Sequence, residues 1–212
     1  MADNYIEKKM EELRSGGART VKSGPTLDTL LLRNRSCRGY KKDYVVKRLQ
    51  LERIVGVTTR VASARNQQVL RYRLVTAEDQ EASRSVLKNI HLGGALPELH
   101  LPFPGTEPEA FIVICSTVPE TRYVDIDLGI AAQSMLLKAT EMGLAGIVIC
   151  AFDPKTVMQE LELPYPPVCI IAIGKPAETF RLQTIKPEES RNYFREAGVH
   201  VVPKLALEDI LI

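Results

Sequence analysis

Apolar residues recur every three or four positions in several segments of the chain, and this spacing predicts amphipathic helices. Leu49, Ile54 and Val57 show it within residues 46–62. The same pattern predicts further helices over residues 4–13, 27–32, 82–90, 126–142 and 154–161. Residues 126–142 are apolar around most of the helix circumference, which indicates a helix buried in the core or against a partner chain.

Other apolar positions follow one another without interruption and predict strands. Such runs occupy residues 111–116, 147–151 and 168–173, and each fits a strand buried on both faces. Residues 71–76 alternate between apolar and polar side chains, which predicts a further strand. Glycine and proline recur through residues 91–108, so we expect an irregular surface loop of the kind that often covers a binding site.

The order of these elements indicates an α+β fold. Helices come first, and the strands that follow are not all connected by the regular helical crossovers that a doubly wound parallel sheet requires. No internal repeat divides the chain, so we expect a single domain over residues 1–212, with an N-terminal helix and a C-terminal tail that packs on the body or on a partner subunit. The GxGxxG and GxxxxGK[ST] patterns are missing, so neither a Rossmann dinucleotide site nor a P-loop is predicted.

The composition is that of an ordinary soluble protein. Hydrophobic residues make up 45% of the 212 positions and the formal net charge is +2, which gives no support to a nucleic-acid-binding role. The sequence contains no secretory signal pattern and no apolar run of roughly 18 residues, so we expect a cytoplasmic protein without a membrane partner. Cys115, Cys150 and Cys169 lie in apolar runs and are interpreted as buried small hydrophobic residues.

Side chains that could carry chemistry directly are scarce. The chain has three histidines, none of which stands beside a serine or cysteine motif typical of nucleophilic catalysis, and no metal site is predicted from ligand spacing. If the protein is an enzyme, we therefore expect a bound cofactor to carry the reaction while the protein supplies position and electrostatics.

Three segments are candidates for binding such a cofactor. In RNRSCRGY (residues 33–40), closely spaced arginines and a serine can clamp a phosphate, although a basic run can also be a solvated face or a nucleic-acid contact. In ASARNQQ (residues 62–68), amide side chains suit the donors and acceptors of a flavin edge, although a polar turn has the same composition. The third segment, DLGIAAQS (residues 127–134) with GLAG (residues 143–146), can equally be a core helix and its C-cap.

Together with the IGKPAE sequence that follows the last buried strand, these segments resemble, in the same order, the motifs of the nitroreductase family of FMN-dependent oxidoreductases. The resemblance extends over residues 31–178 and includes a similar VPK…LEDI tail. It implies an α+β fold with a mixed central sheet flanked by helices, in a homodimer that binds FMN at the subunit interface. It also implies ping-pong hydride transfer, in which NADH or NADPH reduces FMN, which then reduces a nitroaromatic, quinone or related acceptor. A non-catalytic or specialised flavin-binding protein of the same fold is the alternative.

The resemblance also assigns roles to particular residues, with no catalytic side chain because the chemistry takes place on the flavin. The arginine-rich segment would hold the phosphate or the polar edge of the ring, and residues 63–68 would contact the ring or the ribityl chain. Arg65 is the nearest candidate for positive charge beside the ring. The residues expected to bind FMN are Arg35, Ser36, Arg38, Ser63, Ala64, Arg65, Asn66, Gln68, Gly146, Ile147 and Lys204.

The chain departs from the family pattern at two places. Val69 and Leu70 stand where the family has a proline and a tryptophan, and Leu205 stands where many members have a phosphate-binding arginine. Lys204 is adjacent and can supply positive charge in place of that arginine. An ammonium group binds a phosphate as a point charge, however, and cannot form the bidentate fork of a guanidinium.

Overall fold

The computed structural model describes residues 24–94 and 101–212, so the helix expected over residues 4–13 lies outside the described part. Its helices are α2 (Leu27–Arg33), α3 (Arg48–Val55), α4 (Gln80–Asn89), α5 (Arg122–Glu141) and α6 (Pro154–Glu160), with the 3-10 turns η1 (Gly56–Arg60) and η2 (Ala64–Asn66). Its strands are β1 (Leu70–Val75), β2 (Ala110–Ser116), β3 (Ala145–Ile149), β4 (Pro167–Gly174), β5 (Thr179–Ile185), β6 (Phe194–Glu196) and β7 (Val199–Leu205). The described parts of residues 91–108 contain no helix or strand, as expected for a loop.

The helix expected over residues 46–62 is shorter than the pattern predicts. It ends as α3 at Val55 and continues as the tighter turn η1. The hydroxyls of Thr58 and Thr59 donate to the carbonyl oxygens of Val55 and Gly56, at 2.8 and 2.9 Å. Hydroxyl groups bonded to nearby carbonyls compete with regular helical hydrogen bonding, which accounts for the early end of the α-helix.

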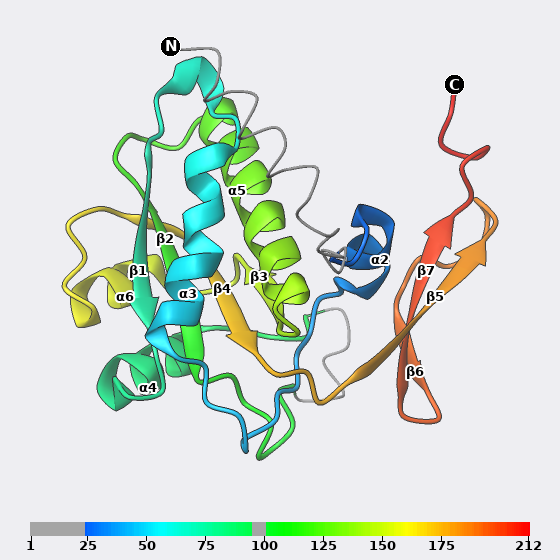
Figure 1. Cartoon of the computed structure of the whole chain (residues 1–212), viewed down its shortest axis with the longest axis horizontal. Coiled ribbons are helices and arrows are strands. Elements are labelled where there is room, and N and C mark those ends of the chain that lie inside the picture. Colours follow the sequence, from blue (N-terminus) through cyan, green and yellow to red (C-terminus); the bar gives the residue numbers. More distant parts are fainter. Residues whose placement is uncertain (1–23, 95–100) are drawn as a thin grey trace, which may run out of the picture.

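Four strands form the central sheet in the order β1-β2-β4-β3 (Figure 1). All three pairings are antiparallel, which corrects the expectation of a mixed sheet for these four strands. Within the described residues, this sheet has one parallel contact, the bridge between Ser36 and Gly146 at the edge of β3. Strand direction depends on how the connections cross the sheet, and apolar runs in the sequence carry no information on that.

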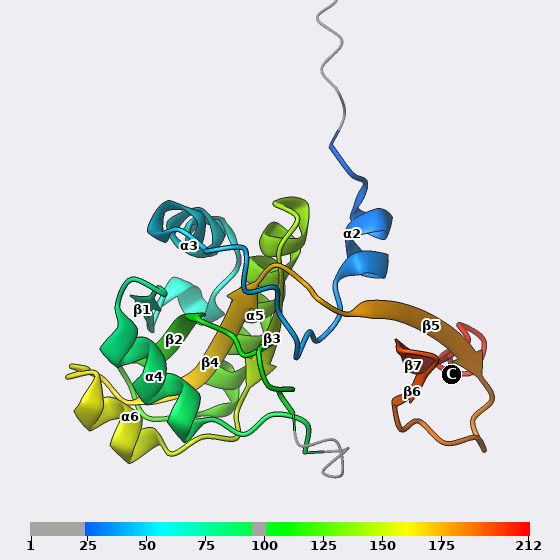
Figure 2. The same ribbon diagram turned by 90° about the horizontal axis from the view of Figure 1, so that it is seen from below.

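Helices cover both faces of the central sheet and form two cores. On one face α3 and α5 pack against residues such as Ile112 and Ile171, and on the other α4 and α6 pack against Phe111 and Ile170 (Figure 2). All seven residues of β2 are buried. The apolar runs thus predicted β2 and β4 correctly as strands buried on both faces, whereas β3 leaves Val148 39% exposed. The helices and the sheet together form an α+β sandwich that positions the loops at its edges.

The long helix α5 carries large apolar side chains that the described residues leave exposed. Val124, Ala131 and Met135 face the sheet and are buried. Tyr123 and Ile126, on the opposite side, are 60% and 46% exposed. Uncovered apolar side chains of this size on a long helix are typical of a surface that meets another protein.

The last part of the chain forms a second sheet that the sequence patterns did not predict. Strand β7 lies between β5, its parallel neighbour, and β6, its antiparallel neighbour. Figure 2 shows this sheet beside the helix–sheet–helix body rather than within it. The apolar residues that follow β7 are exposed, as for Leu207 at 64% and Leu211 at 66%. Packing of the C-terminal tail on the body or on a partner remains a prediction.

The cysteines correct one sequence-based interpretation. Cys37, Cys115 and Cys169 are buried, and burial raises the pKa of Cys115 to about 11 and that of Cys169 to about 12. Cys150 is exposed rather than buried, because β3 ends one residue before it.

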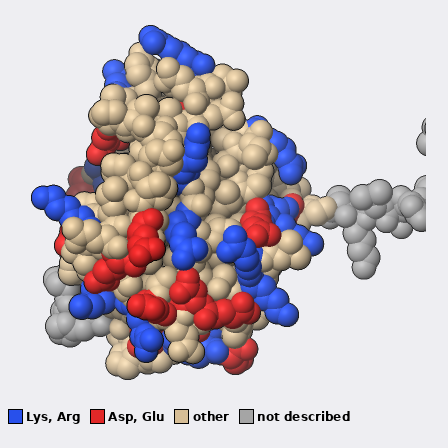
Figure 3. Space-filling view, turned by 90° about the vertical axis from the view of Figure 1, so that its left-hand side faces the viewer, with Lys and Arg blue, Asp and Glu red and all other residues tan. Residues whose placement is uncertain are grey.

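The surface carries charges of both signs. On the face seen in Figure 3, acidic and basic side chains are interspersed over the lower part, and neither sign forms a large continuous patch. Among the helices within residues 24–94 and 101–212, none has the length and the apolar character needed to cross a membrane.

Candidate functional site

The arginine-rich segment lies along the free edge of β3. It leaves α2 at Asn34, and Ser36 then forms the bridge with Gly146, where the Cys37 N–H donates to the Gly146 carbonyl at 3.0 Å. A side chain at Gly146 would not fit, because a Cβ there would lie 2.5 Å from the Ala172 carbonyl oxygen. The fold therefore brings together two predicted site elements that are about a hundred residues apart in the sequence.

Glu178 anchors this segment at Arg38. One oxygen of its buried carboxylate accepts the backbone N–H groups of Arg38 at 2.6 Å and Gly39 at 3.1 Å. The other oxygen accepts the guanidinium of Arg195, forming an ion pair in which the Glu178 side chain is only 6% exposed. Glu178 is the last residue of the IGKPAE motif. The motif marked this segment, but its residue types did not predict that Glu178 would anchor the arginine-rich segment.

The side chain of Arg38 is held by the C-terminal sheet. Its guanidinium carbon lies 4.6 Å from the centre of the Tyr193 ring, a cation–π contact, and one nitrogen donates to the Ser36 carbonyl at 3.2 Å. Arg38 is 9% exposed, and within the described residues its Nε–H has no hydrogen-bond partner. A buried charged donor without a partner is costly, so this position favours an additional acceptor such as an anion.

His200 extends the same cluster on β7. It is 2% exposed, stacks on Tyr193 with ring centres 5.0 Å apart, and also faces Phe180. Its pKa is lowered, first by burial and also by Arg38 and Arg195, while Glu178 acts in the opposite direction. His200 is therefore neutral at neutral pH. The sequence offered no signal for it, because only the fold places β7 beside the arginine-rich segment.

Arg35 in this segment and Lys42 just after it each have partners within the chain. The guanidinium of Arg35 donates to the carbonyls of Leu31 and Leu32 at the end of α2, and the ammonium of Lys42 pairs with Glu107 and Glu109. Burial raises the pKa of the Cys37 thiol far above its usual range, so this residue is a neutral packing group. The segment is thus a folded edge of the protein and not a uniformly solvated basic face.

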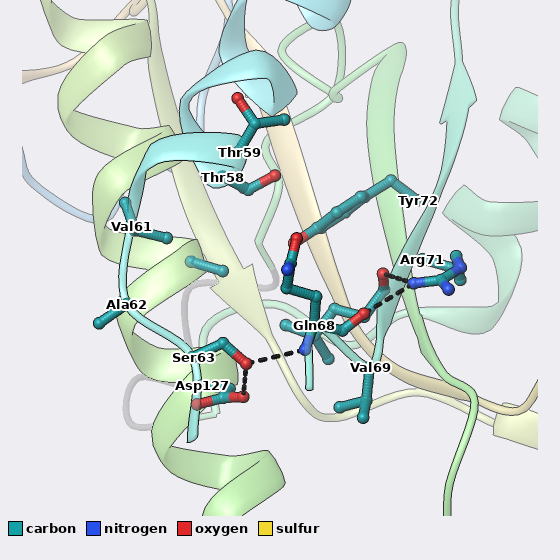
Figure 4. A pocket seen from close by; sticks show the side chains of 12 residues that line it. Thr58, Thr59, Val61, Ala62, Ser63, Gln68, Val69, Arg71, Tyr72 and Asp127 are labelled. Atoms are coloured by element: carbon teal, nitrogen blue, oxygen red, sulfur yellow. Dashed lines mark hydrogen bonds between the residues drawn. The ribbon is translucent and has the colours of Figure 1, made fainter. Parts of the chain in front are cut away.

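The second predicted segment is fixed on α5. The Asp127 carboxylate accepts the Ser63 hydroxyl at 2.6 Å and the Ala64 N–H at 2.8 Å (Figure 4). The Ser63 hydroxyl oxygen accepts the Gln68 N–H at 3.0 Å, and the Gln68 side-chain amide donates to the Asn66 side-chain oxygen at 3.1 Å. Residues 63–68 therefore form an ordered loop whose side chains Arg65, Asn66 and Gln68 remain exposed.

A hollow of about 180 Å³ adjoins this loop, between η1, β1 and the first half of α5. Figure 4 shows the side chains of Thr58, Tyr72 and Gln68 around it, with Asp127 and Ser63 at its lower edge. Burial raises the pKa of the Tyr72 phenol, so it is a neutral hydrogen-bonding group at neutral pH. The hollow offers hydroxyl and amide groups together with apolar walls.

The two halves of the predicted site do not meet within one chain. The loop is anchored at Asp127, whereas Gly146 lies close to Leu136. These two positions of α5 are about 14 Å apart along the helix, at about 1.5 Å per residue. The side chain of Ile147 is in the core rather than at the surface, and Lys204 is exposed on β7 opposite Thr184. Lys204 is four residues further along β7 than His200, the residue that faces Arg38.

Metal chemistry receives no support from the geometry. Within residues 24–94 and 101–212, no three or more histidine, cysteine or acidic side chains are grouped as they would be to hold a metal ion. The candidate site consists of guanidinium, hydroxyl and amide donors, which are groups that bind phosphates and polar ring edges.

Known proteins with the same architecture identify the family. The nitroreductase family model matches residues 31–175, more than half of the chain, and the chain belongs to this family. No curated protein matches the chain.

Several solved structures share the fold. An FMN-dependent nitroreductase from Clostridium difficile R20291 is 26% identical with a TM-score of 0.57, over 70% of this chain and 87% of that chain. A nitroreductase family protein from Clostridium difficile 630 is 24% identical with a TM-score of 0.55, over 70% and 83% of the two chains. A nitroreductase from Exiguobacterium sibiricum 255-15 in complex with FMN is 14% identical with a TM-score of 0.59, over 74% and 90%. The last two likenesses show the fold alone.

Proposed function

We propose that this protein is an FMN-dependent oxidoreductase that uses NADH or NADPH to reduce nitroaromatic, quinone or related acceptors. The observation that carries the proposal is the bridge between the arginine-rich segment and Gly146, which joins two motifs that the family resemblance assigns to FMN. The FMN-dependent nitroreductase from Clostridium difficile R20291, which is 26% identical, supports the same cofactor.

The residues at this edge fit a flavin phosphate by their chemistry. Arg35, Ser36 and Arg38 supply guanidinium and hydroxyl donors, and the buried Nε–H of Arg38 has no partner among the described residues. Guanidinium groups bind phosphate in a charge-assisted and often bidentate manner. The exposed amides of Asn66 and Gln68 suit the polar edge of the ring. These residues would hold FMN, and Lys204 would add positive charge to the phosphate.

When bound, FMN would supply the chemistry of hydride transfer between a reduced nicotinamide and the acceptor. The chain itself is expected to bind and orient the cofactor and to place positive charge, from Arg65, beside the ring. No side chain of the described site stands as an acid, base or nucleophile for the acceptor, which is consistent with a broad range of acceptors.

We also propose that the site is completed in a homodimer. The two halves lie at different positions along α5 of one chain, and α5 leaves Tyr123 and Ile126 exposed on its outer side. Helix α2 has no buried residue, and its Leu27 and Leu32 are 62% and 64% exposed. A second copy covering these apolar faces would bring its residues 63–68 to the arginine-rich edge of the first.

The function is tested by the visible spectrum of the FMN-loaded protein without oxygen. We expect NADH or NADPH to remove the visible flavin absorbance, and a quinone added afterwards to restore it. A protein that takes up no FMN would contradict the proposed cofactor. A protein that binds FMN but keeps its spectrum with both nicotinamides would instead be a non-catalytic flavin-binding member of the fold.

A further inference from the structure

The loop of residues 63–68 has a strained backbone. Arg65, Asn66 and Gln68 have φ angles of 52°, 53° and 49°, so three of the five non-glycine residues with positive φ in the described chain fall within four positions. A side chain in this left-handed region costs about 1 kcal/mol or more, and such conformations persist only where the surroundings enforce them. Something outside the loop must therefore hold it.

Asp127 on α5 holds the start of the loop, while Arg71 donates to the Gln68 carbonyl at its end. Asp127 is 5% exposed although it is a carboxylate, and none of the ion pairs formed by residues 24–94 and 101–212 includes it. Its two oxygens accept the Ser63 hydroxyl and the Ala64 N–H at the start of the loop. Ser63 also restrains the end of the loop, because its hydroxyl oxygen accepts a hydrogen bond from the Gln68 N–H. A single buried carboxylate thus fixes both ends of the strained segment.

We propose that Asp127 is a positioning residue for the flavin: through Ser63 it holds Arg65, Asn66 and Gln68 in the left-handed conformation that presents the Asn66 and Gln68 amides to the cofactor. This inference rests on the proposed function, because it concerns the same cofactor. Asp127 acts through Ser63 and Ala64, and its oxygens are occupied by these two donors. Its contribution is to remove in advance the entropy that an unrestrained loop would lose on binding FMN.

The test measures FMN binding, by quenching of flavin fluorescence, to five variants of the full chain. We expect Ser63→Ala and Asp127→Ala each to weaken FMN binding at least about tenfold, and the double variant to bind little more weakly than either, because both changes break one chain of hydrogen bonds. Asp127→Asn should bind FMN more tightly than Asp127→Ala, because its side-chain oxygen can still accept the Ala64 N–H. Asp125→Ala is the matched control on the exposed side of the same helix and should bind FMN as the unaltered protein does.

Amide hydrogen exchange of residues 63–69 without FMN provides the second readout. We expect faster exchange at Ala64 and Gln68 in the Ser63→Ala and Asp127→Ala variants, with the rest of α5 still protected. The role of Asp127 would be overturned if Asp127→Ala changed neither the hydrogen exchange of the loop nor the FMN affinity. It would also be overturned if the losses of binding free energy in the two single variants added fully in the double variant. An unaltered protein that takes up no FMN would overturn the proposed function, while the exchange rates would still report whether Asp127 holds the loop.

Discussion

Gly146→Ala is expected to destabilise the protein by about 3 kcal/mol, because overpacking of this kind typically costs 1–3 kcal/mol and the contact here is with backbone. An added Cβ would lie 2.5 Å from the Ala172 carbonyl oxygen and 2.8 Å from the side chains of Ile173 and Leu136. The carbonyl belongs to β4 and cannot move without disturbing the centre of the sheet. We expect urea unfolding to show the loss, together with a melting temperature lower by about 6–12 °C.

Gly56→Ala provides the matched control for this prediction. No heavy atom lies within 4 Å of a Cβ placed at Gly56, and its φ of −56° suits any residue. The Gly56→Ala substitution should leave the free energy of unfolding unchanged or raise it slightly, because alanine restricts the conformations of the unfolded chain. Equal effects of the two substitutions would show that β3 packs against β4 and α5 less closely than the contacts at Gly146 imply.

Glu178→Ala is expected to cost about 3 kcal/mol, because removing one partner of a buried ion pair leaves the other charge uncompensated. The substitution leaves the Arg195 guanidinium, whose side chain is 20% exposed, without its carboxylate partner. It also removes the acceptor of the Arg38 and Gly39 N–H groups. The same loss should release the arginine-rich segment from the C-terminal sheet. Chemical unfolding measures the first effect, and hydrogen exchange at Arg38 and Gly39 measures the second.

Glu196→Ala is the control for the loss of a carboxylate in the same sheet. Glu196 pairs with Arg181, but both side chains are more than half exposed, at 61% and 54%. Exposed ion pairs contribute about 0–1 kcal/mol, so this variant should unfold nearly as the unaltered protein does. If Glu178→Ala were equally mild, Glu178 would not be the anchor that joins the arginine-rich segment to the C-terminal sheet.

The sequence predicted the body of the fold because its signals there are local. Uninterrupted apolar runs marked β2 and β4, and continuous apolarity marked α5. Strands β5 and β6 were missed because most of their residues are exposed and carry charged or polar side chains. Strand direction was also missed, since it depends on the path of the connections and not on the residues within a strand.

The candidate site was predictable only in part for a similar reason. The motifs located the arginine-rich segment, the loop of residues 63–68 and Gly146, but not the groups that hold them in place. Asp127 lay at the start of the third candidate segment, but its contact with Ser63 spans 64 residues and no local pattern predicts it. Glu178 accepts the backbone N–H of Arg38, and His200 stacks on the Tyr193 ring that Arg38 also contacts. No pattern of residues close in sequence encodes contacts of this kind.

The central claim is that each flavin site combines the arginine-rich edge of one chain with residues 63–68 of the other. The direct test co-expresses Arg35→Glu and Arg65→Asp variants with different affinity tags and isolates the heterodimer. Each variant alone should bind FMN poorly, whereas the heterodimer should bind about one FMN per dimer, because one of its two symmetric sites combines two unaltered halves. A heterodimer that binds no more FMN than the separate variants would place both halves of the site in one chain and contradict the account.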